Sequence, residues 1–311
     1  MTANGAELLV KQLVDHGVDR VYSLNGGHIA PIYDACLDVD IEIIDVRHED
    51  AAVHMAHAYA RLTGRPGVAC LTAGPGVTNG ISAMAAAWSA ASPVVVIAGK
   101  VPIPQIDKGA LQDVDQIALV GAVSKTARSV RTTDQIREAV SEAFSVAAEP
   151  VQGPTFLEIP IDVLRSDADS SIDTAKATVD PKTPPDGSRL PMHAIAAAVE
   201  LLTSAERPVL IAGSGVLWSN AENSVRTLAE RLGMPVVTTS LARGILPIDH
   251  PLNLYAARSR VLDAADVLLI VGTRFNYILN YGRPPRISST AKVIRIDASP
   301  SEIVRNRTSD V

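Results

Sequence analysis

Short runs of apolar, partly β-branched residues recur along the first half of the chain, and segments with helical periodicity lie between them. Continuous apolar runs of this kind are typical of strands that helices cover on both faces of a parallel sheet. Helices are expected at residues 6–16 and 30–38. The expected strands are residues 21–24, 41–46, 67–71, 93–98 and 155–159. The pattern therefore predicts an open α/β domain over residues 1–165.

The composition changes between residues 166 and 188, where Asp, Ser, Thr, Lys and Pro dominate. Such a segment cannot build a packed core, and we interpret it as a linker. A second alternating pattern occupies residues 189–311, with a helix near 193–202 and another that ends at Leu232. Its expected strands are 208–212, a short one at Val236, 267–271 and 293–296. The predicted fold class is α/β, with two doubly wound parallel-sheet domains, of which the second is Rossmann-like.

Bulk properties narrow the class of protein. With 311 residues, 47% hydrophobic and 20% charged side chains, the chain can bury a large core in about two domains. A formal net charge of −6 with scattered Lys and Arg argues against nucleic-acid or membrane partners and favours a small-molecule substrate. The two cysteines, Cys36 and Cys70, lie in apolar runs typical of buried thiols in a reducing compartment. Without a targeting or membrane-spanning segment, we expect a cytoplasmic location.

Two strand-to-helix junctions carry candidate chemistry. Glu49 follows the strand at 41–46 and directly precedes an alanine-rich helix, and a glycine loop at residues 72–80 follows the strand at 67–71. In an open α/β sheet, ligands bind in a crevice outside the carboxyl ends of the strands. The two junctions therefore predict a ligand crevice, although a lone Glu at a strand end is more often a solvated cap or an ion-pair partner.

Five strings, in order and at family-like spacing, resemble the thiamine diphosphate enzymes of the acetolactate synthase type. They are LNGGH at 24–28, RHE at 47–49, TAGPGVTN at 72–79, GALQ at 109–112 and GPTFLEIP at 153–160. The stretch GTRFNYILNYG at 272–282 is more similar to 2-hydroxyacyl-CoA lyases and oxalyl-CoA decarboxylases, because acetolactate synthases carry an Asp-Asp-Arg pattern there.

The resemblance implies roles for three catalytic candidates. Glu49 would share a proton with the pyrimidine nitrogen N1′ of the cofactor, and His28 would face the thiazolium and relay a proton to or from the substrate. Gln112 would bond the substrate carbonyl or the cofactor amine from a loop. The alternatives are a histidine bonded to backbone and a plain loop amide. Further cofactor contacts are implied for Gly26, Gly27, Gly74, Pro75, Gly76 and Asn79.

The second domain carries weaker signals. Gly213-Ser214-Gly215 after a strand is a weak phosphate-loop pattern. Asp297 at a strand end could accept bonds from a ribose, and Arg274, near Asn276, could pair with a phosphate. If the domain binds a nucleotide, the lyase-like stretch favours ADP or coenzyme A over flavin; alternatively the domain keeps the shape without a ligand.

Enzymes of this type have three domains, and the resemblance covers only the first two. Because no Gly-Asp-Gly pattern of the diphosphate domain occurs, no metal ligand is expected in this chain. We expect a second polypeptide to supply the diphosphate domain with Mg²⁺, in a dimer of heterodimers or a larger assembly. Truncation of a longer chain is the alternative.

The expected reaction is cleavage or formation of the C–C bond of a 2-hydroxyacyl-CoA, which gives an aldehyde or ketone plus formyl-CoA. The second candidate is acetolactate synthase-like decarboxylation and ligation of 2-oxo acids. A nicotinamide oxidoreductase is disfavoured, because the loop at Gly213 lacks the spaced third glycine of that fingerprint. The catalytic candidates Glu49, His28 and Gln112 argue against a non-catalytic subunit.

Overall fold

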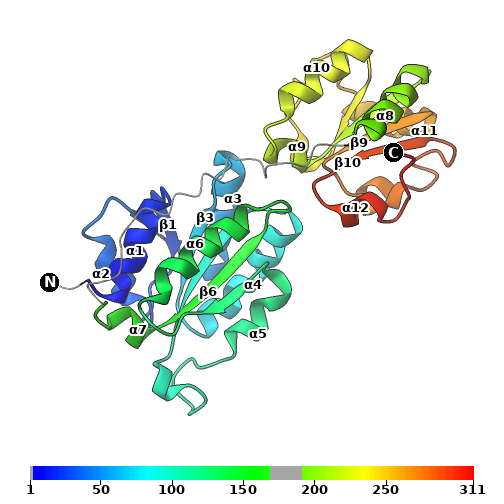
Figure 1. Ribbon diagram of the computed structural model, residues 1–311. Helices are drawn as coiled ribbons and strands as arrows, with labels where there is room; N and C mark the ends of the chain where they lie inside the picture. Colours follow the sequence, from blue (N-terminus) through cyan, green and yellow to red (C-terminus); the bar gives the residue numbers. More distant parts are fainter. Residues whose placement is uncertain (1–2, 169–190) are drawn as a thin grey trace. The chain divides into compact units, whose positions relative to one another are not determined.

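The computed structural model describes residues 3–168 and 191–311, and the chain divides into two compact units, Met1–Lys182 and Thr183–Val311 (Figure 1). Most of the expected linker at 166–188 lies outside the described residues. Its first residues pair with the start of the chain, since Gly5 N donates to Ser166 O at 3.0 Å and Ala168 N donates to Ala3 O at 2.8 Å. Ser166 and Ala168 therefore belong to the first unit.

The first unit is built on a six-stranded parallel sheet in the order β2-β1-β3-β4-β6-β5 (Figure 1). Its strands are β1 (Arg20–Ser23), β2 (Glu42–Asp45), β3 (Gly67–Leu71), β4 (Val94–Lys100), β5 (Ala127–Ser129) and β6 (Pro154–Pro160). Every residue of β3, β4 and β6 is buried, as expected for central strands covered on both faces. The continuous apolar runs of the sequence therefore correspond to the middle of the sheet.

Helices cover both faces of this sheet and form two separate hydrophobic clusters with it. One face carries α1 (Gly5–Asp15), α2 (Ala30–Cys36), α6 (Gln135–Ala148) and α7 (Ile161–Arg165). The other carries α3 (Glu49–Thr63), α4 (Pro75–Ser89) and α5 (Gln116–Val120), with short 3-10 turns η1 (Ile103–Gln105) and η2 (Gly121–Val123) nearby in the chain. α1 begins with a capping box, in which Asn4 Oδ1 accepts from Glu7 N at 3.0 Å and Glu7 Oε2 accepts from Asn4 N at 2.8 Å.

The second unit contains a four-stranded parallel sheet in the order β10-β9-β7-β8. Its strands are β7 (Pro208–Ala212), β8 (Val236–Thr238), β9 (Val267–Val271) and β10 (Lys292–Ile296). Its helices are α8 (Met192–Ser204), α9 (Ser214–Trp218), α10 (Glu222–Leu232), α11 (Arg258–Ala264) and α12 (Pro300–Val304), with 3-10 turns η3 (Ser240–Ala242), η4 (Tyr255–Ala257) and η5 (Tyr277–Gly282). The prediction of two parallel-sheet α/β domains is confirmed.

Both cysteines are buried free thiols, as the sequence predicts. Burial raises the pKa of Cys36 to about 11 and raises the pKa of Cys70 as well, so both side chains are protonated at neutral pH. Within residues 3–168 and 191–311, no helix is long and apolar enough to cross a membrane.

Candidate functional site

Three loops meet at the carboxyl edge of the first sheet, because β1 lies between β2 and β3. The loop after β1 carries Gly26 and His28, α3 begins at Glu49 after β2, and Gly74 leads into α4 after β3. A hydrogen bond of 2.9 Å from Asn79 Nδ2 to Glu49 Oε2 joins the second loop to the third. The two strand-to-helix junctions, between which the sequence predicts a ligand crevice, are therefore in direct contact through Glu49 and Asn79.

Glu49 is the first residue of α3 and is only 7% exposed. The helix is capped by His48, whose Nδ1 accepts from Asp50 N at 3.2 Å, and the positive end of the helix dipole favours a carboxylate at this position. Asn79 binds one carboxylate oxygen. The other, Oε1, faces Gly76, since a Cβ built on Gly76 would lie 3.5 Å from it. Glu49 is thus fixed at one oxygen and presents the other to the glycine loop.

Thr72 lies between two glycines beside this carboxylate. A Cβ built on Gly26 would lie 2.4 Å from Thr72 Cβ, and one built on Gly76 would lie 2.8 Å from Thr72 Cγ2. Thr72 Oγ1 is buried and has no hydrogen-bond partner among the described residues. A buried hydroxyl without a partner is unfavourable, and the protein leaves this unsatisfied polar atom beside the carboxylate. Thr72 is not among the site residues that the sequence predicts.

We expect replacement by alanine to affect stability differently at Gly26 and Gly27, the two adjacent glycines of the loop after β1. Gly26→Ala should lower the free energy of unfolding by about 1–3 kcal/mol, because its methyl group would clash with Thr72. Gly27→Ala is the matched control and should change stability by less than about 0.5 kcal/mol, because nothing lies within 4 Å of its Cβ. Chemical denaturation measures both, and equal stability of the two variants would contradict this geometry.

His28 and Gln112 form a second part of the site, and their side chains interact closely enough for Gln112 to affect the pKa of His28. Burial lowers the pKa of His28, and the interaction with Gln112 acts in the opposite direction. Gln112 also packs against the glycine loop, since a Cβ built on Gly74 would lie 2.6 Å from Gln112 O. The structure therefore brings Gln112 to both His28 and Gly74. An imidazole that is neutral near pH 7 can accept a proton.

Three half-buried histidines predict how stability depends on pH. Burial lowers the pKa of His16, His28 and His57 below the ordinary value of 6.5, so the folded state binds fewer protons than the unfolded state at mildly acidic pH. The free energy of unfolding should therefore fall as the pH drops from 7 toward 5. Thermal melts at several pH values measure this.

The pH dependence should be weaker in His28→Gln than in the unmodified protein. His54→Gln is the control at a side chain that is 48% exposed. A melting temperature that rises as the pH falls toward 5 would contradict the burial of these imidazoles.

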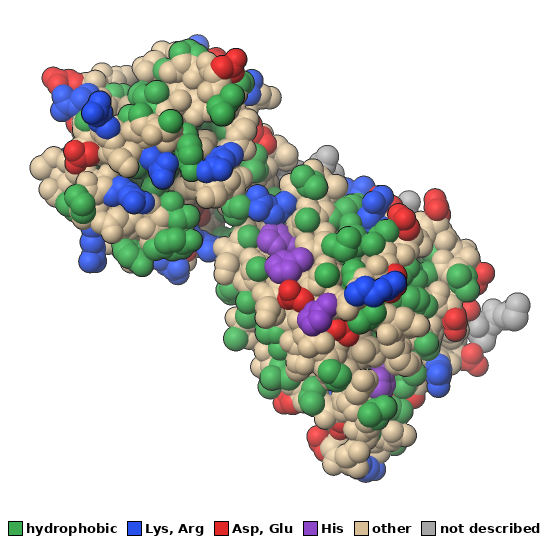
Figure 2. Space-filling view, turned by 180° about the vertical axis from the view of Figure 1, so that it is seen from behind, with side chains coloured by type: hydrophobic (Ala, Val, Ile, Leu, Met, Phe, Trp, Pro, Cys, Tyr) green, Lys and Arg blue, Asp and Glu red, His purple; other side chains and the backbone are tan. Residues whose placement is uncertain are grey.

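Histidine side chains gather on one face of the first unit in Figure 2, close to acidic side chains. On α3, His54 Nε2 lies 3.5 Å from Asp50 Oδ2, one helical turn away. In the part of the chain that the structure describes, no group of three or more His, Cys, Asp or Glu side chains could hold a metal ion. His54 and Asp50 therefore form an ordinary contact on the helix surface.

In the second unit, Gly213 and Gly215 allow two loops to cross. Gly213 N donates to Val271 O at 2.9 Å and Gly215 N donates to Gly272 O at 3.0 Å. A Cβ built on Gly213 would lie 2.2 Å from Gly272 O. Both amides are thus used by backbone carbonyls, and a phosphate at this loop would need other donors.

The remaining nucleotide candidates lie near the carboxyl ends of β9 and β10. Asp297 Oδ1 accepts from Ser299 N at 2.9 Å, and burial raises the pKa of this carboxyl. Arg274 Nε lies 3.6 Å from Glu302 Oε1, and Asn276 Oδ1 accepts from Ile278 N at 3.0 Å at the start of η5. Asn276 therefore has a local structural role, whereas Arg274 and Asp297 belong to a charged group.

Two buried charged residues of this region are absent from the sequence prediction. Arg295 Nε and Nη2 and Glu302 Oε2 are buried without hydrogen-bond partners among the described residues. A charged residue between apolar neighbours in Val293-Ile294-Arg295-Ile296 was the only signal for the arginine. These atoms could therefore form further hydrogen bonds, and they lie near the same sheet edge as Asp297.

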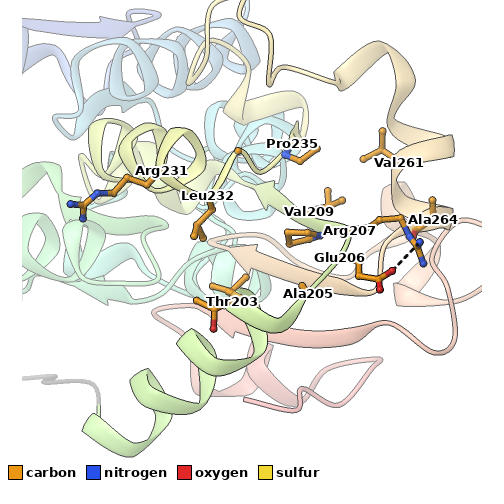
Figure 3. A pocket seen from close by; sticks show the side chains of 13 residues that line it. Thr203, Ala205, Glu206, Arg207, Val209, Arg231, Leu232, Pro235, Val261 and Ala264 are labelled. Carbon is orange, nitrogen blue, oxygen red and sulfur yellow. Dashed lines mark hydrogen bonds and ion pairs between the residues drawn. The ribbon is translucent and has the colours of Figure 1, made fainter.

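A cavity of about 660 Å³ in the second unit lies at the opposite, amino-terminal edge of its sheet (Figure 3). Arg207 and Pro235, which precede β7 and β8, line it together with Leu232 and Val261. In Figure 3 the ion pair between Arg207 and Glu206, at 3.7 Å, lies at one end of the cavity. None of the nucleotide candidates lines this cavity.

Comparison with known proteins shows the family of the chain. Residues 3–119 match the family described as thiamine pyrophosphate enzyme, N-terminal TPP binding domain, and residues 195–311 match thiamine pyrophosphate enzyme, central domain. The chain belongs to the thiamine pyrophosphate (thiamine diphosphate) enzyme family. The site described above lies in the part that matches the N-terminal TPP binding domain.

Relatives carry two kinds of name. The chain is 38% identical to the acetolactate synthase large subunit IlvG of Mycobacterium tuberculosis over 282 residues, which are 90% of this chain and 51% of that protein. It is 34% identical to 2-hydroxyacyl-CoA lyase 2 of Danio rerio, over 97% of this chain and 53% of that protein. It is 33% identical to 2-hydroxyacyl-CoA lyase of Arabidopsis thaliana, over 96% of this chain and 53% of that protein. The chain therefore spans about half the length of the curated relatives it matches.

Proposed function

We propose that this chain holds the pyrimidine half of thiamine diphosphate in a lyase or carboligase, and that Glu49 is the proton partner of the pyrimidine ring. The observation that carries the proposal is the buried carboxylate, bound by Asn79 at one oxygen and open to the glycine loop at the other. When bound, the cofactor supplies the reactive carbon and electron sink for C–C chemistry next to a carbonyl.

The residues around Glu49 fit that group. Thr72 Oγ1, buried without a partner among the described residues, can bond a polar ring atom, while Gly26 and Gly76 leave no side chain in the way. Gly74 and Pro75 begin α4 and bring the backbone close to the ring. Asn79 holds Glu49 in one orientation, so the proton on its free oxygen is directed at the ligand.

His28 and Gln112 act on the substrate side. The neutral imidazole accepts a proton from, or returns it to, the substrate oxygen, and burial keeps it neutral at pH 7 by lowering its pKa. The Gln112 side chain binds His28 and orients the ring. Its remaining amide atoms are available to the substrate carbonyl.

For the reaction, we favour cleavage or formation of the C–C bond of a 2-hydroxyacyl-CoA, with acetolactate synthase-like ligation of 2-oxo acids as the second candidate. Relatives with both names have similar identity to this chain. The stretch at 272–282, which is more similar to 2-hydroxyacyl-CoA lyases, favours the first. In that case the charged group around Asp297 and Arg274 binds the ADP part of coenzyme A, with Arg295 and Glu302 supplying further polar atoms.

The remaining part of the enzyme comes from a second polypeptide or from a further part of a longer chain, which holds the diphosphate and Mg²⁺. This proposal is supported by the half-length match to the relatives. We call this chain together with the part that carries the remaining half the assembled enzyme.

The test of the reaction is a product assay. The assembled enzyme, with thiamine diphosphate and Mg²⁺, is incubated either with a 2-hydroxyacyl-CoA or with pyruvate. The favoured proposal expects an aldehyde or ketone and formyl-CoA from the first substrate. If pyruvate is decarboxylated and ligated while the 2-hydroxyacyl-CoA is recovered unchanged, the second candidate is correct.

A further inference from the structure

The segment between β4 and α5 places Gln112 at the site, and its backbone is held in an unusual conformation. Gln112 has φ +66°, in the left-handed region that residues other than glycine seldom adopt. Conformations of this kind cost about 1–3 kcal/mol and persist only where the surrounding structure holds them. Two sets of buried polar contacts lie directly after Gln112.

The first is an ion pair between the end of β4 and this segment. Lys100 Nζ lies 2.9 Å from Asp113 Oδ1, and the two side chains are only 5% and 8% exposed. The ammonium group also donates to Val114 O at 2.5 Å, and Asp113 Oδ2 accepts from Asp107 N at 2.7 Å. The hydrogen bond from Lys100 lowers the pKa of Asp113 below its usual value. The residue next to Gln112 is thereby tied to the sheet and to the start of its own loop.

The second is centred on Gln116, the first residue of α5, which is fully buried. Its Oε1 accepts from Gly74 N at 2.8 Å, and its Nε2 donates to Glu158 Oε2 at 2.8 Å and to Gly99 O at 3.2 Å. One amide therefore connects the glycine loop, the end of β4 and the buried carboxylate of β6. Gly74 is also the residue against which Gln112 packs.

We propose that Lys100 and Gln116 are positioning residues, whose buried contacts with Asp113, Glu158 and Gly74 hold Gln112 in its left-handed conformation against His28. Lys100 acts on Gln112 alone through Asp113. Gln116 acts on Gln112 and also on the glycine loop. The kinetic consequences of this inference rest on the proposed function, whereas its structural consequences do not.

The structural test is hydrogen–deuterium exchange in the purified chain, followed in peptides that cover residues 106–115. Lys100→Met and Gln116→Leu should each accelerate exchange there by about tenfold or more, with little change in α1 or α6. Gln12→Leu is the matched control, because Gln12 is a 4% exposed glutamine on α1. Unchanged exchange in both variants, or equal acceleration in the control, would overturn the inference.

Lys100→Met leaves the Asp113 carboxylate buried without its cation, which can prevent folding. The double variant Lys100→Met with Asp113→Leu removes both charges and avoids this problem. It should show the same accelerated exchange around Gln112. A folded double variant with unchanged exchange counts against the inference as directly as the single one.

The kinetic test uses the assembled enzyme and a double-mutant cycle. Lys100→Met should lower kcat by about tenfold to a hundredfold while the Kd for thiamine diphosphate changes by less than about twofold. In a Gln112→Ala background, the same substitution should have almost no further effect on kcat, because its target is gone. If this combination instead loses kcat by the product of the two single-variant losses, Lys100 has a general structural role and the inference is overturned. If the unmodified assembled enzyme is inactive, the proposed function fails and the exchange experiment alone decides the positioning role.

Discussion

Replacing Glu49 by Gln is expected to lower kcat of the assembled enzyme by about 10²–10⁴-fold, the range typical of a lost general acid–base group. The amide keeps the size of the side chain and can still accept a hydrogen bond from Asn79, but it cannot take up or release a proton in the way that a carboxylate can. The expected loss is in the chemical step, since the shape of the buried site changes little. Steady-state kinetics with the substrate found in the product assay measures it.

The control for this prediction is Glu222→Gln, because Glu222 is also the first residue of a helix but lies in the second unit. It should keep kcat within about twofold, as expected for a substitution of a residue that is not part of the site. Comparable activity of Glu49→Gln and the unmodified enzyme would rule out a role for this carboxylate in proton transfer. A loss of the folded state in Glu49→Gln, visible by circular dichroism, would instead indicate a structural role.

The second large effect concerns cofactor binding. The Kd of this chain alone for thiamine diphosphate should be higher than that of the assembled enzyme by at least about 10²-fold. The proposed site contacts only the pyrimidine half, and two missing charge-assisted bonds to the diphosphate correspond to about 3–6 kcal/mol, or about 10²–10⁴ in Kd. Isothermal titration calorimetry with and without Mg²⁺ measures both values.

Thiamine without the diphosphate is the matched ligand for this experiment. Its affinity should differ little between the chain alone and the assembled enzyme, because it lacks the group that the remaining half is proposed to hold. Tight binding of thiamine diphosphate by this chain alone, dependent on Mg²⁺, would contradict the proposed division of the site.

The sequence predicted the features of the fold that depend on local patterns. Continuous apolar runs identified the buried strands β3, β4 and β6 to within about one or two residues, because strands covered on both faces have few polar positions. It missed β5, whose three residues Ala-Arg-Ser are only half buried. It also missed α6, although Ile136, Ala139, Val140, Ala143 and Phe144 form a clear helical stripe.

The site could be predicted only in part, because local sequence patterns do not encode contacts between distant residues. Glu49 stands at a strand end next to a helix, which is a local signal, and the resemblance named Asn79, His28 and Gln112 as site residues. It did not predict that Asn79 binds Glu49 or that Gln112 contacts His28. Thr72, Lys100 and Gln116 were not found, because their importance lies in contacts with distant residues. Gln116, for example, meets both Gly74 and Glu158 at a separation of 42 positions. No periodicity or motif encodes such a contact.

The proposed proton transfer by Glu49 can be measured without knowing the substrate. The assembled enzyme, loaded with thiamine diphosphate and Mg²⁺, is mixed with D₂O, quenched in acid, and the exchange of the thiazolium C2 proton is followed by NMR. The unmodified enzyme should exchange this proton faster than free cofactor does, and Glu49→Gln should reduce the rate by about 10²-fold or more. Equal exchange rates in the two proteins would contradict the assignment of Glu49 as the proton partner of the cofactor.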